Sequence, residues 1–155
     1  MTTRALEDQE IQAIFNCVDG CNAKRNETLL ITGIGMALRA SELVGLQVGD
    51  VCDGAGEGVV STHRTLAKSY VTIRAETAKF QKERTIRIGD DIQNTIFDFM
   101  EWKVENSESA EKGSPLFVSQ KGGHLTRIAY VCALCSLMRL LVEADMSTTH
   151  KAFKS

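Results

Sequence analysis

The sequence predicts a mainly helical α+β domain that contains a small three-stranded antiparallel sheet. Apolar residues recur with the 3.6-residue period of a helix at both ends of the chain, and they alternate with the two-residue period of a strand between residues 59 and 90. The chain has 155 residues, 43% of them hydrophobic and 25% charged. That length suits one buried core rather than two. We therefore expect residues 1–155 to form a single domain without internal repeats.

Three helices are expected before residue 59. The first has apolar residues at the spacing i, i+3, i+4 and i+7 over residues 11–18. The second covers residues 29–38, which are apolar on every side and predict a buried helix with Asn26 as its cap. A short helix over residues 41–46 follows, and the glycine-rich stretch 53–58 predicts a loop.

The sheet is expected in the middle of the chain. Val59-Val60 is the candidate first strand, and the alternating stretches 70–75 and 85–88 are the second and third. A turn near residues 79–82 would join the last two strands as a hairpin.

Two further helices are expected after the sheet. Asp90 or Asp91 would cap the first of them. Its apolar face holds Ile92, Ile96, Phe99 and Met100. A polar loop over residues 106–114 and a short buried piece at 116–118 come next. Thr126 would then cap a long helix that extends to about residue 144, with Tyr130 and Leu134 on its apolar face.

The distribution of charge is more informative than its sum. The net charge of −2 argues against a protein that binds nucleic acid by electrostatics alone. Residues 62–87, however, carry seven basic and two acidic side chains, a net +5. Such a segment is either a stripe that contacts phosphates or a solvated hairpin whose lysines discourage edge pairing. No stretch is long and apolar enough to span a membrane, and the N-terminus lacks the apolar core of a signal peptide. We expect a cytoplasmic protein.

The cysteines predict neither disulfides nor a metal site. The five thiols are Cys17, Cys21, Cys52, Cys132 and Cys135. Cys132 and Cys135 have the spacing of metal ligands but lie in a helical apolar run, with no second closely spaced pair of Cys or His to complete a site. We expect reduced cysteines in the core and no metal or other cofactor.

Three side chains stand out by their context as candidates for phosphate chemistry. Arg39 follows an apolar helix, Lys79 lies at the expected hairpin tip, and His150 follows the long helix. An arginine binds the non-bridging oxygens of a phosphodiester through its fork, and a lysine or histidine can protonate the leaving alkoxide. The alternative is that Arg39 forms an ion pair with a carboxylate such as Glu42 and that His150 is a surface histidine.

Residues 30–51 resemble the first-arginine motif of the tyrosine recombinases, the family of phage and integron integrases. That motif reads roughly Thr-Gly-Leu-Arg-x-Ser-Glu-Leu-x-x-Leu-x-x-x-Asp-Val, and this chain has Met-Ala-Leu-Arg39-Ala-Ser-Glu42-Leu with Asp50-Val downstream. The start of the chain from residue 6, the Lys79–Ile88 segment and residues 116–126 are similar to further parts of the same catalytic domain, in order. Thr149-His150 falls where the family's His-x-x-Arg motif begins.

The resemblance implies DNA integration and recombination without metal or nucleotide, as in mobile elements. Arg39 would hold the scissile phosphate with Glu42 supporting it, Lys79 would act as general acid, and His150 would assist proton transfer. Duplex DNA is the implied partner. Its expected contacts in the basic segment are Arg64, Lys68, Arg74, Lys82 and Arg84.

The chain departs from the family pattern at its C-terminal end. Phe153 stands where the family has its second catalytic arginine, and neither Tyr70 nor Tyr130 is placed to attack a phosphate. We therefore expect an incomplete, truncated catalytic domain that is inactive alone, binds DNA weakly and self-associates through residues 130–142. The alternatives are a non-catalytic module that binds DNA or another integrase, and an unrelated small helical interaction protein.

Overall fold

The computed structural model of this chain describes residues 7–9, 12, 22–53, 68–78 and 81–135. The elements with defined bounds are the helices α2 (Ala23–Gly35), α3 (Ala40–Val44), α4 (Val48–Val51) and α5 (Asp90–Glu105) and the strands β1 (Tyr70–Ile73) and β2 (Arg84–Arg87). A further helix runs through residues 127–135, the last that are described. Most of the helix expected over residues 11–18, the strand expected at Val59-Val60 and the chain after residue 135 lie outside the described residues.

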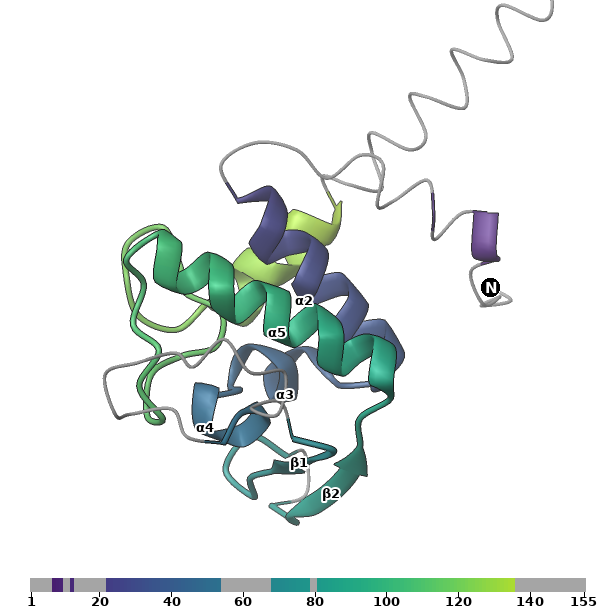
Figure 1. Ribbon diagram of the computed structural model, residues 1–155. Coiled ribbons are helices and arrows are strands. Elements are labelled where there is room, and N and C mark those ends of the chain that lie inside the picture. Colours follow the sequence, from purple (N-terminus) through teal and green to yellow (C-terminus); the bar gives the residue numbers. More distant parts are fainter. Residues whose placement is uncertain (1–6, 10–11, 13–21, 54–67, 79–80, 136–155) are drawn as a thin grey trace, which may run out of the picture.

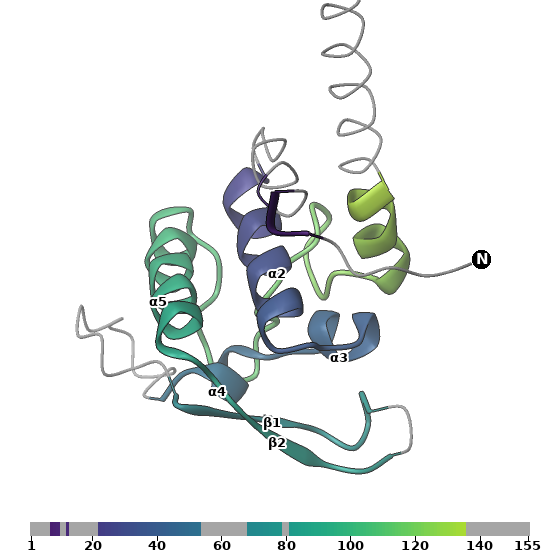
Figure 2. The same cartoon turned by 90° about the vertical axis from the view of Figure 1, so that its right-hand side faces the viewer.

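The described elements form a helical layer above a β-hairpin. Helices α2 and α5 pack against each other, and helix 127–135 lies on the other side of α2 (Figures 1 and 2). The short helices α3 and α4 lie between this layer and the hairpin of β1 and β2 (Figure 2). The predicted α+β class is confirmed, because helices and an antiparallel sheet occupy separate stretches of the chain.

Helix α2 contains most of the predicted apolar run, but it begins and ends earlier than expected. It is not buried on every side, because Ile34 is 46% exposed. Its cap is Asn22, and Asn26 lies one turn inside the helix, where its backbone N–H donates to the carbonyl oxygen of Asn22 at 2.9 Å. The cap at Asn26 was therefore wrong. The side chain of Asn26 instead accepts hydrogen bonds from the guanidinium of Arg25. Leu29 and Leu30 are almost completely buried.

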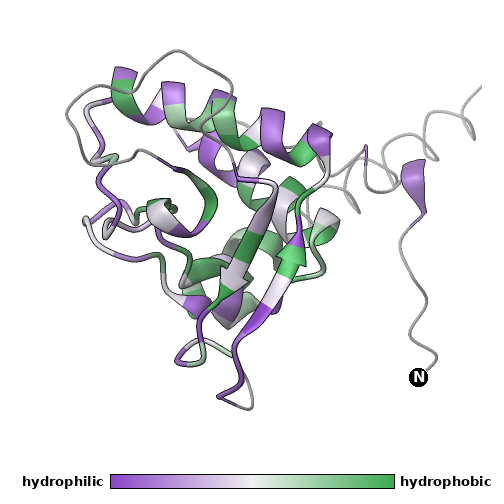
Figure 3. Ribbon diagram, turned by 60° about the horizontal axis from the view of Figure 1, so that its bottom comes forward, coloured by the Kyte–Doolittle hydropathy of each residue, from purple (hydrophilic) through white to green (hydrophobic). Residues whose placement is uncertain are grey.

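The described sheet has two antiparallel strands, against the three expected. Val71 pairs with Ile86, and Ile73 pairs with Arg84. Hydrophobic and more polar residues alternate along β1, whereas Ile86 is the one hydrophobic residue within β2 (Figure 3). Val71 and Ile73 are buried while Tyr70 is 56% exposed. One face of the hairpin therefore packs on the core, as the alternation predicted.

Helix α5 supplies the centre of the core. Gly89 is its N-cap, which corrects the expected Asp90 or Asp91. Both carboxylates lie in the first turn, where their negative charge interacts favourably with the positive end of the helix dipole. The expected apolar face is confirmed at Ile96, Phe99 and Met100, which are buried. Phe99 stacks on Trp102 and lies against Phe117.

The final described helix begins where its sequence predicts. The hydroxyl oxygen of Thr126 accepts a hydrogen bond from the backbone N–H of Ala129 at 3.1 Å, so Thr126 is the cap. Tyr130 and Leu134 face α2 and are half-buried.

The cysteines follow a different pattern from the one predicted. Cys52 is buried, but Cys132 and Cys135 are exposed, because the residues of helix 127–135 that face α2 are Tyr130, Ala133 and Leu134. The expectation of buried core cysteines was therefore wrong for Cys132 and Cys135. Cys17 and Cys21 lie outside the described residues.

Candidate functional site

Arg39 is the residue from which the candidate site is built. It is the N-cap of α3 with extended backbone (φ −71°, ψ 153°), and its backbone N–H donates to Glu42 Oε2 at 2.9 Å. The Glu42 carboxylate thus supplies one half of a capping box by accepting from the N-cap backbone, which is why the Arg-x-x-Glu spacing begins a helix here. The Arg39 side chain is 51% exposed, and its Nη1 lies 3.3 Å from Glu42 Oε1. The ion pair with Glu42 that the sequence left open is therefore present, and half of the Arg39 side chain still faces solvent.

Glu42 is the buried centre of the site. Its side chain is 0% exposed, and Oε2 also accepts a hydrogen bond from Arg84 Nη2 at 2.6 Å. Burial by itself raises the pKa of Glu42. The hydrogen bonds from the Arg39 backbone and from Arg84, together with the charge of Arg84, outweigh that effect and hold the pKa below its ordinary value. Glu42 is thus an anion that two arginines share.

The segment leading into the hairpin tip is fixed against α3. The hydroxyl of Ser41 donates to the carbonyl oxygen of Thr77 at 3.3 Å, and Arg74 Nη2 donates to the carbonyl oxygen of Gly45 at 2.5 Å. A Cβ on Gly45 would lie 2.5 Å from Thr77 Cγ2, so only glycine permits this approach. Lys79 itself lies outside the described residues, but its chain neighbour Ala78 ends the anchored segment.

The other expected DNA contacts differ in their surroundings. Lys68 donates to the carbonyl oxygen of Gly49 at 2.6 Å and pairs with Asp53 at 3.5 Å. Arg74 pairs with Asp50 at 3.4 Å. Lys82 is exposed on the stretch that enters β2. Arg64 and His150, like Lys79, fall outside the part of the chain that is described.

The contact between Arg84 and Glu42 was missed in the sequence, although a signal for it exists. Residues directly opposite each other in an antiparallel pair share a face of the sheet. Arg84 is opposite the buried Ile73, and Ile86 is opposite the buried Val71, so Arg84 lies on the same side of the hairpin as these core residues. The Arg84 side chain is still 42% exposed, and its guanidinium reaches from this face of the hairpin to the buried carboxylate of Glu42.

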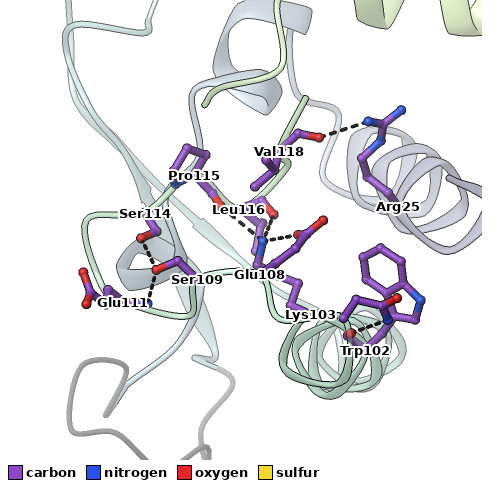
Figure 4. Close-up of polar contacts among 11 residues, drawn as sticks. Arg25, Trp102, Lys103, Glu108, Ser109, Glu111, Ser114, Pro115, Leu116 and Val118 are labelled. Carbon is purple, nitrogen blue, oxygen red and sulfur yellow. Dashed lines mark hydrogen bonds and ion pairs between the residues drawn. The ribbon is translucent and has the colours of Figure 1, made fainter. Parts of the chain in front are cut away.

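A second buried ion pair lies at the C-terminal end of α5. Lys103 is 0% exposed, and its Nζ donates to Glu108 Oε2 at 2.7 Å and to the carbonyl oxygen of Leu116 at 3.1 Å (Figure 4). Nearby, Arg25 Nη1 donates to the carbonyl oxygen of Val118 at 3.0 Å. These cations join α5 and α2 to the segment after residue 114, and their donors are directed at protein acceptors.

Metal binding and nucleophilic catalysis by a thiol or a phenol place further requirements on the described residues. No group of three or more His, Cys, Asp or Glu side chains in the described ranges is arranged to hold a metal ion. Burial raises the pKa of the Cys52 thiol to about 12, which keeps it protonated and unreactive. Burial also raises the pKa of Tyr130. What the site offers is a half-exposed guanidinium at the start of a helix, held by a buried carboxylate, which suits the binding of a phosphate oxygen.

Comparisons with known proteins agree with this geometry. A scan against family models matches the phage integrase family over residues 4–152. Among solved structures, the chain is similar to a crystal structure of XerA recombinase, with a TM-score of 0.64 at 13% identity; the match covers 91% of this chain. The chain spans 44% of the length of that structure, and the likeness concerns the fold. A search of curated proteins found no match. Within the described residues, no helix has the length and apolar character to cross a membrane.

Proposed function

Because the chain belongs to the phage integrase family, as the match over residues 4–152 shows, we propose that it contributes the phosphate-binding part of a tyrosine-recombinase catalytic domain. Arg39 binds a non-bridging oxygen of a phosphate in duplex DNA. Glu42 orients Arg39 for this contact.

The observation that carries this proposal is that Arg39 has a fixed backbone and a half-exposed side chain. Its backbone is fixed as the helix cap, and its guanidinium is tethered on one side to Glu42 while the side chain is 51% exposed. An arginine has five N–H donors in a planar fork, so a single long contact to Glu42 leaves donors for an anion. Charge-assisted hydrogen bonds of this kind contribute about 1.5–3 kcal/mol each.

Lys79 and His150 complete the proposed site. In the family chemistry that the resemblance implies, a tyrosine attacks the phosphorus and the 5′-oxygen leaves. Lys79 donates the proton that the leaving oxygen takes up, and His150 assists the transfer. Support for Lys79 comes from its neighbours, because Thr77 and Ala78 end a segment anchored on the helix that Arg39 begins.

We propose that this 155-residue chain does not form a covalent bond to DNA by itself. Tyr70 lies three residues from Ile73, the β1 residue opposite Arg84, which is about 10 Å along the strand at 3.3 Å per residue. Its side chain is exposed and faces away from the core. Tyr130 is half-buried with a raised pKa, which disfavours the phenolate. A nicked duplex that traps covalent intermediates should therefore give no denaturation-resistant adduct, and an adduct mapped to Tyr70 or Tyr130 would contradict this.

Binding to a short labelled duplex, measured by fluorescence anisotropy at low salt, tests the role of Arg39. Arg39→Ala should weaken binding about tenfold, the equivalent of about 1.4 kcal/mol. The matched control is Lys24→Ala, which removes a positive charge near the start of α2, at the end of that helix away from the hairpin (Figures 1 and 2). Equal losses in the two variants, or no binding by the unchanged protein at low salt, would overturn the proposal.

Two finer expectations are proposals of the same kind. Self-association through residues 130–142 is supported at the described end of that stretch, where Val131 is 44% exposed, and by Ile128, which is 77% exposed. Replacing both with serine should shift the sedimentation coefficient toward the monomer. A sedimentation coefficient that is unchanged by the replacement would count against this interface. A cytoplasmic location stays a prediction.

A further inference from the structure

We infer that Arg84 is a positioning residue for Arg39, which it serves through Glu42 rather than by contacting DNA. This inference rests on the proposed function, because it concerns how Arg39 is kept available for a phosphate. It differs from the sequence-based expectation, in which Arg84 was one of the DNA contacts in the basic segment 62–87.

The carboxylate of Glu42 is divided between the two arginines. Oε2 accepts from the Arg39 backbone N–H at 2.9 Å and from Arg84 Nη2 at 2.6 Å, whereas Oε1 lies 3.3 Å from Arg39 Nη1. The contact with Arg84 is the shorter and therefore the stronger of the two side-chain contacts. Arg84 thus provides most of the neutralisation of a carboxylate that is 0% exposed.

This division decides how much of the Arg39 charge is left for a ligand. A buried carboxylate needs a compensating cation, because an unpaired buried charge costs several kcal/mol. If Arg84 is removed, Arg39 is the only cation left among the described contacts of Glu42, and its guanidinium is drawn toward the carboxylate. With Arg84 present, the two arginines together carry one more charge than Glu42 neutralises. This remaining charge of +1 is on the side chains of Arg39 and Arg84, which are about half exposed.

The direction of the Arg84 side chain supports the same role. Arg84 shares the inward face of the hairpin with Ile73, and it reaches across to α3. Arg87, in the same strand, is opposite the exposed Tyr70 and is itself exposed. Arg87 is therefore a matched control, an arginine three residues away in the same strand that faces the other side of the hairpin from the Glu42 contact.

A double-mutant cycle between Arg84→Gln and Glu42→Gln separates positioning from direct contact. We expect Arg84→Gln to weaken binding to a short duplex about tenfold at low salt when Glu42 is present, and less than about twofold in the Glu42→Gln background. Arg84→Lys should restore part of the affinity, because a lysine can still pair with Glu42. A loss that is the same in both backgrounds would show direct contact with DNA and overturn the inference.

A measurement without DNA distinguishes failure of this inference from failure of the proposed function. In NMR spectra of the free protein, Arg84→Gln should shift the guanidinium signals of Arg39 and raise the pKa of the Glu42 carboxyl, whereas Arg87→Gln should do neither. Unchanged Arg39 signals in a folded Arg84→Gln protein would overturn the inference, whether or not the protein binds DNA. If Arg84→Gln does not fold, Arg84→Lys carries the same comparison, with smaller shifts in the same direction expected.

Discussion

Two ion pairs with a fully buried partner, both in the described part of the chain, differ in which charge is buried, and one of them leaves half-exposed cations for a ligand. At the start of α3 the buried partner is an anion, Glu42, and its cations Arg39 and Arg84 have side chains that are 51% and 42% exposed. At the end of α5 the buried partner is a cation, Lys103 at 0% exposure, and its anion Glu108 is 25% exposed.

The difference shows why the first pair is a candidate site and the second is structural. We call the pair of Lys103 and Glu108, which fixes the loop after α5, the structural clasp. The ammonium of Lys103 donates to a carboxylate and to the carbonyl oxygens of Pro115 and Leu116, so its hydrogen-bonding capacity is directed into the protein. The guanidinium of Arg39 makes one long side-chain contact and retains donors toward solvent. Both pairs contribute to the fold, but only the first can bind a phosphate without breaking its own contacts.

The clasp should show the largest loss of stability. Glu108→Ala leaves the charge of Lys103 buried without a carboxylate, and it should lower the free energy of unfolding by about 3 kcal/mol. Chemical denaturation measures this change. Glu105→Ala, at the exposed end of α5, is the control and should stay within about 0.5 kcal/mol. A loss as small as that of the control would mean that the clasp is dispensable.

A methyl group between α3 and the hairpin should have the next largest effect. Gly45→Ala places a Cβ 2.5 Å from Thr77 Cγ2 and 3.0 Å from the carbonyl oxygen of Ser41, so the anchored segment must move. We expect a loss of about 1–3 kcal/mol in denaturation and weaker DNA binding. Gly113→Ala enters open space and should change neither. Unchanged stability and binding in Gly45→Ala would show that the hairpin position does not matter.

The pH dependence of stability should report on the buried charge of Glu42. The pKa of Glu42 is lower in the folded chain than its ordinary value of 4.5, so the unfolded chain takes up the proton first as the pH falls. The stabilisation is therefore complete above pH 4.5 and is lost as the pH drops through the folded pKa. Glu42→Gln should flatten the fall of the free energy of unfolding below that pH. The same slope in both proteins would mean that Glu42 is not held as an anion.

The smallest expected effect is on the salt dependence of DNA binding. Each phosphate contact contributes a slope of about 0.9 to the fall of the logarithm of affinity with the logarithm of salt concentration. Lys82→Ala should reduce the slope by one such contact, and Lys79→Ala together with Lys82→Ala should reduce it further. Lys24→Ala, on α2, should leave the slope unchanged. Equal slopes in all these proteins would remove Lys82 from the DNA-binding surface.

Local patterns in the sequence were sufficient for much of the fold and for the centre of the site. The alternation of Val71 and Ile73, the cap at Thr126 and the helix after Arg39 depend on residues within a few positions of each other. The same holds for the pairing of Arg39 with Glu42 at i and i+3. Such signals survive in a single sequence because local sterics and hydrogen bonds determine them.

Contacts between distant segments were decided by the tertiary structure. Arg84 lies 42 residues from Glu42, and which arginine of the basic segment reaches that carboxylate depends on the hairpin face that packs on α3. Lys103 is buried by a loop that turns back over α5, and Cys132 is exposed because helix 127–135 presents another side to α2. The physical reason is the same in each case. Burial of a charged or apolar side chain depends on which surfaces meet, and that is a property of the packed chain rather than of the neighbouring residues.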